Sequence, residues 1–152
     1  MKYYDEPIEI SADVWAELLT DSNVTQKKDL EVLKLIYENR DHEMHASDIA
    51  KKLNLSHHAT LNLQIPQFSK RVIARTGVRP PTRENGSTRW WHVPFLGCDK
   101  DDGTCSWIMR PELVEAWEQV FGQADPEIVY PGEITVQDSA DLFEGAVSQI
   151  IV

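Results

Sequence analysis

Apolar residues recur at spacings of three and four in five segments of the chain, which is the spacing of one face of an α-helix. The five segments are residues 10–21, 25–39, 46–53, 56–72 and 111–121. Ser11 stands where an N-cap would begin the first helix. In the fourth segment we expect one stripe to face the core: Leu61, Ile65, Phe68 and Val72.

The third and fourth segments together predict a helix-turn-helix. Asn54 and Leu55 make the turn between them, and Ser56 can cap the second helix. Pro66 lies inside that second helix. Because proline removes a backbone hydrogen bond and clashes with a carbonyl of the preceding turn, we expect a kink, or a break at which Pro66 starts a new segment.

Turn residues replace the helical spacing after Gly77. Residues 89–97 and 105–110 then predict two strands of a β-hairpin, joined by the acidic loop 98–104. A helix-turn-helix followed by a hairpin predicts a winged helix, a mainly helical α+β domain. We assign residues 1–121 to this domain and residues 122–152 to an extended acidic segment.

The net charge of −10 is unevenly distributed along the chain. Residues 45–92 hold eight Lys/Arg and two Asp/Glu, whereas residues 111–152 hold nine acidic residues and no basic one. This asymmetry favours a surface for a polyanion on the middle of the chain. The alternative is a basic face that only meets solvent.

The helix over residues 56–72 carries side chains of the types that can read base edges in DNA, since Asn and Gln can bond adenine and Thr can contact a pyrimidine methyl group. On its exposed side or flanks we expect Ser56, His57, His58, Thr60, Asn62 and Gln64. Phosphate contacts are expected from Lys70, Arg71, Arg75, Arg79, Arg83 and Arg89. The two histidines have an alternative interpretation, as a pH-sensitive pair or as ordinary residues of the helix start.

Three tryptophans are candidates for contact with a modified base. Trp90 and Trp91 are neighbours on the first predicted strand, so they face opposite sides, and Trp107 can pair with one of them across the hairpin. A reader of modified cytosine needs an apolar contact with the methyl group or an aromatic sandwich for an extruded base. The alternative is that Trp107 and one of the pair fill the core beneath the hairpin.

Three blocks in this order, "SHHATLNLQIPQFSKRV", "RWWHVPFLG" and "CSWIMRPELVEAWEQV", resemble the N-terminal domain of bacterial HNH endonucleases grouped with methylcytosine-dependent restriction enzymes. The tail "DLFEGAVSQIIV" is similar to the stretch that leads into the nuclease of such enzymes, and the resemblance covers roughly residues 28–152. It implies a module of bacterial defence that binds double-stranded DNA carrying 5-methylcytosine or 5-hydroxymethylcytosine. The implied partners are that DNA and a C-terminal HNH nuclease domain, with a homodimer as a further arrangement.

We predict no catalytic residue, metal or cofactor in this chain. An HNH nuclease needs a histidine to activate water, further metal ligands and commonly Cys-x-x-Cys pairs, and the chain has no Cys-x-x-Cys. A specificity module is therefore expected rather than an enzyme. The alternatives are a winged-helix transcriptional regulator and a protein-interaction domain.

The sequence also predicts a cytoplasmic protein without a membrane partner. It contains no apolar run of about 20 residues, and its start lacks the basic and apolar regions of a signal peptide. A disulfide between Cys98 and Cys105 fits the hairpin geometrically, but we do not expect it in a reducing compartment.

Overall fold

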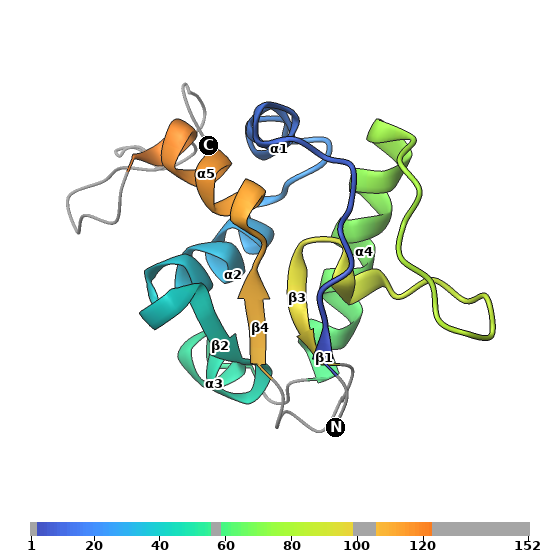
Figure 1. The fold of residues 1–152 in the computed structure, drawn as a ribbon. Helices are drawn as coiled ribbons and strands as arrows, with labels where there is room; N and C mark the ends of the chain where they lie inside the picture. Colours follow the sequence, from blue (N-terminus) through green and yellow to red (C-terminus); the bar gives the residue numbers. More distant parts are fainter. Residues whose placement is uncertain (1–2, 56–58, 99–105, 123–152) are drawn as a thin grey trace. The chain divides into compact units, whose positions relative to one another are not determined.

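The computed structural model describes residues 3–55, 59–98 and 106–122 (Figure 1). Within these residues the chain forms five α-helices and a four-stranded antiparallel sheet, which confirms the α+β class. The chain divides into two compact units, the first made of Met1–Ile10 with Glu31–Arg110 and the second of Ser11–Leu30 with Pro111–Val152. Helix α2 (Lys27–Glu38) starts in the second unit and continues in the first.

The second unit is built on helices α1 (Ala12–Leu19) and α5 (Pro111–Phe121), which pack against each other. The Ser11 hydroxyl accepts a hydrogen bond from the Val14 backbone N–H at 3.2 Å, so the predicted N-cap is confirmed. Both helices bury aromatic and aliphatic side chains: Trp15, Leu18, Leu19, Leu113, Ala116, Trp117 and Phe121. The described part of this unit is therefore a helical pair with an apolar interface.

The first unit contains α3 (Ala46–Lys52) and α4 (Ala59–Thr76), which contact each other. Asn54 adopts a left-handed backbone with φ of 59°, and the Leu55 N–H donates to the Ala50 carbonyl at 2.9 Å. The predicted turn is therefore present. The predicted core stripe of α4 is confirmed too, with exposed fractions of 0 or 1% for Leu61, Ile65, Phe68 and Val72.

Helix α4 is continuous across Pro66, so of the two expected outcomes the break is wrong, and the kink stays a prediction. The apolar stripe explains the continuity, because Ile65 on one side and Phe68 on the other are both buried in the core. A break would expose part of that stripe. Burial of side chains of this size is worth about 1.5–3 kcal/mol each, which offsets the cost of about 3 kcal/mol for an interior proline.

The sheet has the order β1-β3-β4-β2, made of β1 (Tyr3–Tyr4), β3 (Phe95–Cys98), β4 (Ser106–Met109) and β2 (Glu43–His45). Figure 1 shows β4 between β3 and β2. The second predicted hairpin strand is confirmed. The first begins at Phe95 and not at residue 89, because Trp90–His92 form a short 3-10 helix, η2.

The carbonyl groups of His92 and Val93, at the end of η2, explain why the strand starts late. Arg110 donates from Nη2 to the carbonyl of His92 at 2.6 Å and from Nε to the carbonyl of Val93 at 2.9 Å. These oxygens are therefore satisfied by a buried side chain and not by a neighbouring strand.

Cys98, at the end of β3, is disulfide-bonded in the structure, so the expectation that no disulfide forms is wrong. The chain holds one other cysteine, Cys105, which lies outside the described residues. Within the described residues, no helix is both long and apolar enough to cross a bilayer.

Candidate nucleic-acid interface

Helix α4 presents one polar face opposite its core stripe. Five of its exposed residues follow spacings of three and four: Thr60, Leu63, Gln67, Lys70 and Ala74. Arg75, in the last turn, is exposed as well but lies off this face. This repeat lines up one side of a helix, as the buried stripe lines up the other. The face combines a hydroxyl, an amide and an ammonium group with one large apolar side chain, Leu63.

Gln64 was expected on this face, but it is buried, with an exposed fraction of 9%. It follows Leu61 by three residues and precedes Ile65, which places it on the edge of the core stripe. The same spacing puts Leu63 and Gln67 on the opposite side. The helical spacing alone therefore predicts that Gln64 is buried and that Gln67 is exposed. Gln67 therefore replaces Gln64 as the exposed glutamine of α4.

The remaining predicted base contacts have different positions. Thr60 is exposed and Asn62 is half-buried at the flank of the helix. Ser56, His57 and His58 lie outside the described residues.

The predicted phosphate contacts divide into exposed and partly covered cations. Lys70, Arg75 and Arg79 are exposed, while Arg71 and Arg83 are half-buried. Arg83 donates from Nη1 to the Thr88 carbonyl at 2.9 Å, which holds its guanidinium close to the loop after α4. Five of the six predicted cations thus reach the surface of the first unit wholly or in part.

Arg89 is the exception, because it is buried with an exposed fraction of 5%. Its guanidinium carbon lies 3.8 Å from the centroid of the Tyr4 ring. Its Nη1 atom lies 3.6 Å from the Glu6 carboxylate and donates to the Thr82 carbonyl at 3.2 Å. Arg89 therefore connects the N-terminal segment to the loop. The prediction that it lies at the surface and contacts phosphate is wrong.

The tryptophans do not lie as the strand prediction required. Trp90 and Trp91 belong to η2, and Trp107 faces Gly97 on β3 and not either of them. Trp107 is 5% exposed and stacks on Phe95 with ring centroids 5.2 Å apart. Trp91 is 9% exposed.

The alternative placement is therefore confirmed, with Trp107 and one of the adjacent pair in the core. A side chain this buried does not contact a base in the folded protein, so Trp91 and Trp107 leave the candidate surface. Trp90 is half-buried, and the Lys70 ammonium lies over its ring at 5.6 Å from the centroid.

His92 is fully buried within the first unit. Its Nδ1 atom lies 2.7 Å from the Phe95 carbonyl, and its Nε2 atom accepts a hydrogen bond from the Glu6 N–H at 3.2 Å. Burial lowers the pKa of His92 below its ordinary value, and the positive charges of Arg110 and Arg89 act in the same direction. The imidazole is therefore neutral near pH 7, protonated on Nδ1, and holds the N-terminal segment in place.

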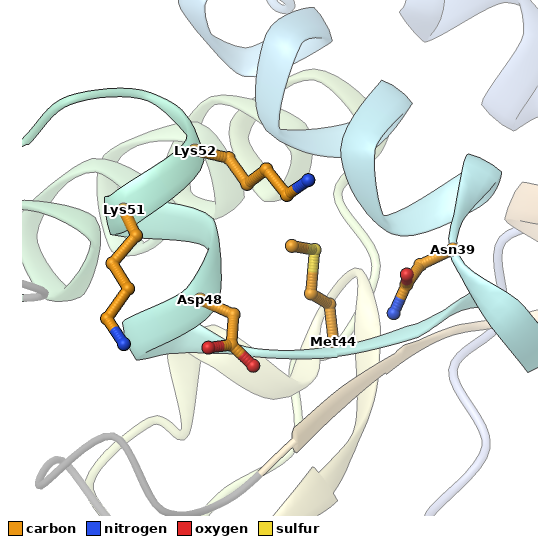
Figure 2. Close-up of a pocket in the computed structure, with 5 residues that line it drawn as sticks. All are labelled: Asn39, Met44, Asp48, Lys51 and Lys52. Carbon is orange, nitrogen blue, oxygen red and sulfur yellow. The ribbon is translucent and has the colours of Figure 1, made fainter.

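A pocket of about 320 Å³ lies elsewhere in the first unit, lined by Asn39, Met44, Asp48, Lys51 and Lys52. Figure 2 shows the Met44 side chain in its centre, with Lys52 and Asn39 reaching in from α3 and from the end of α2. Asp48 is the one carboxylate among these residues. The described lining therefore does not contain the pair of carboxylates that some acid-base sites use.

In the described part of the chain, no group of three or more His, Cys, Asp and Glu residues is placed to hold a metal ion. Comparison with protein-family models, with curated proteins and with solved structures finds no match to this chain. The interpretation of the surface therefore rests on the chemistry of its own residues.

Proposed function

We propose that this chain is a double-stranded DNA-binding module in which α4 lies in the major groove. One observation carries the proposal: the exposed face of α4 joins residues that read base edges, Thr60 and Gln67, to the cation Lys70 on one helix side. Threonine and glutamine contact bases in the groove, and lysine contacts phosphate or guanine. A helix about 10–12 Å wide fits the major groove of B-form DNA.

The order of elements supports a winged-helix arrangement for this module. Helix α2, strand β2, helix α3 and helix α4 precede the hairpin β3-β4, and β2 pairs with β4. In this arrangement the helix-turn-helix presents its second helix, here α4, to the groove. The hairpin then serves as the wing beside it.

The positive charge supports a polyanionic ligand. Lys70, Arg75 and Arg79 are exposed on α4 and on the segment that follows it. Cations so placed would contact phosphates on either side of the groove and set the register of the helix. The net charge of −10 does not oppose this, because residues 45–92 hold only two of the acidic residues.

We extend the proposal to modified DNA and to a partner domain on the strength of the sequence resemblance alone. The ligand would be duplex DNA with 5-methylcytosine or 5-hydroxymethylcytosine, and the module would deliver an HNH nuclease domain to it. A transcriptional regulator would bind duplex DNA without that preference. A protein-interaction domain would bind no duplex.

The test is fluorescence anisotropy of this chain with matched labelled duplexes that carry cytosine, 5-methylcytosine or 5-hydroxymethylcytosine. At low salt we expect binding to all three, because phosphate contacts do not depend on sequence, with tighter binding to a modified duplex. Equal affinities would leave DNA binding standing and overturn the preference for modification. A chain that is folded by circular dichroism and binds none of the duplexes would overturn the proposed function itself.

A further inference from the structure

Leu63 is the most exposed of the large aliphatic side chains on α4. Its exposed fraction is 69%, against 0% for Leu61 and 1% for Ile65 on the same helix. Single exposed leucines are common on protein surfaces, so exposure alone assigns no role. The position of Leu63 on α4 is more informative.

Leu63 lies in the middle of the face that we propose for the groove. It is one turn from Thr60 on one side and from Gln67 on the other, and two turns from Lys70. The cations on and after α4 complement a polyanion and not an apolar protein surface. An occupant of this face must therefore offer negative charge at its edges and an apolar group near the centre.

We propose that Leu63 determines specificity by contacting the 5-methyl group of a pyrimidine in the major groove. This inference rests on the proposed DNA-binding function. The methyl group of thymine projects into the major groove, where apolar side chains recognise it, and 5-methylcytosine carries the same group at the same ring position. Burial of one such group corresponds to about fourfold in affinity.

The helix geometry also places the next contact. Leu63 and Gln67 are four residues apart, which is about 6 Å along the helix axis. Base pairs are stacked about 3.4 Å apart. Gln67 therefore reaches a base one or two pairs away from the methyl group, and its amide suits adenine.

The described tryptophans favour contact in the groove over extrusion of the base. An aromatic sandwich needs exposed ring faces. Trp91 and Trp107 are buried, and Lys70 lies over the ring of Trp90. Leu63 is thus the large apolar side chain that this face offers to a methyl group, beside the smaller Thr60 and Ala74.

The experiment begins with a pool of duplexes whose centre is randomised, from which the wild-type chain selects its preferred sequences. Affinities are then measured by anisotropy for a selected duplex in which each pyrimidine in turn gains or loses its methyl group. Thymine is exchanged for uracil in one arm, and cytosine for 5-methylcytosine in the other. The proteins are the wild type, Leu63→Ala and Val14→Ala, the last being an exposed apolar residue of the second unit.

We expect one position at which the methyl group strengthens wild-type binding by about fourfold, a gain that Leu63→Ala loses and Val14→Ala keeps. The arm in which the gain appears identifies the base. Salt-dependent binding with no methyl effect at any position, or an effect that Leu63→Ala retains, would overturn the inference and leave DNA binding intact. Failure of every pool to bind at low salt would instead overturn the proposed function.

Discussion

Replacement of Trp107 with alanine should destabilise the fold and not act on a base. Trp107 lies on β4 between Met44 and Gly97 of the neighbouring strands and is almost fully buried. It also stacks on Phe95 with an angle of 11° between the rings. Loss of a buried tryptophan costs about 3–5 kcal/mol, a range that includes the aromatic contact of about 0.5–1.5 kcal/mol.

Trp90→Ala is the matched control, because Trp90 is half-buried and its described ring contact is with Lys70. A cation-π contact near the surface contributes about 0.5–1 kcal/mol. We therefore expect Trp90→Ala to lower the free energy of unfolding by less than Trp107→Ala does, because only part of the Trp90 side chain is removed from water.

The assay is urea unfolding followed by circular dichroism. With a slope of about 2 kcal/mol per molar urea, a loss of about 4 kcal/mol lowers the midpoint by about 2 M. Trp90→Ala should shift the midpoint by less than Trp107→Ala does. The packing described for this sheet would be refuted by an unchanged midpoint for Trp107→Ala, or by a larger shift for Trp90→Ala.

Three further predictions test other parts of the structure. Gly97→Ala should destabilise the hairpin by about 1–3 kcal/mol, because φ is +145° and an added methyl group would overlap the Ser106 carbonyl on the neighbouring strand. Gly86→Ala is the control, because its added methyl group would have no atom within 4 Å, and it should cost less in the same urea titration. Because burial lowers the folded-state pKa of His92, the unfolded chain takes up the proton first, so stability should fall as the pH drops below about 6.5. In melts between pH 7 and 5, His92→Gln should flatten this dependence, and an unaltered slope would contradict the assignment. Gln64→Ala should lower the melting temperature because Gln64 is buried, whereas Gln67→Ala should leave it nearly unchanged and weaken DNA binding; the reverse pattern would show that α4 is turned the other way.

Helix faces could be predicted from the sequence because they depend on local spacing. Leu61 and Val72 were placed in the core by a repeat that needs no knowledge of the rest of the fold. The same repeat places Gln64 at the edge of the buried stripe, although its polar side chain favours an exposed position. The same helical spacing predicts that Leu63 and Gln67 lie on the exposed face of α4.

The environment of η2 could not be predicted, because its partners are distant in the sequence. His92 accepts a hydrogen bond from the backbone N–H of Glu6, which is 86 residues away. The carbonyl groups of His92 and Val93 accept hydrogen bonds from Arg110. Arg89 is buried by Tyr4 and Glu6 from the same N-terminal segment. No local pattern indicates such contacts. The sequence therefore predicts a surface position for Arg89 and a strand position for Trp90 and Trp91.

The candidate surface was predicted in outline, because charge is a property that the sequence states directly. The excess of basic residues in 45–92 led to the same segment that presents Lys70, Arg75 and Arg79 at the surface. Its detail required the fold. Only the structure separates these exposed cations from Arg89, which has the same charge and a structural role.

The salt dependence of duplex binding tests the DNA-binding surface most directly. If about four of the exposed and half-buried cations contact phosphate, the logarithm of the affinity should fall against the logarithm of salt concentration with a slope near −4. The double variant Lys70→Ala/Arg79→Ala should bring the slope to about −2. Lys27→Ala/Lys28→Ala, in the second unit, should leave it unchanged. A slope that the first variant does not alter, or a duplex that the folded wild-type chain does not bind, would contradict the placement of DNA on α4.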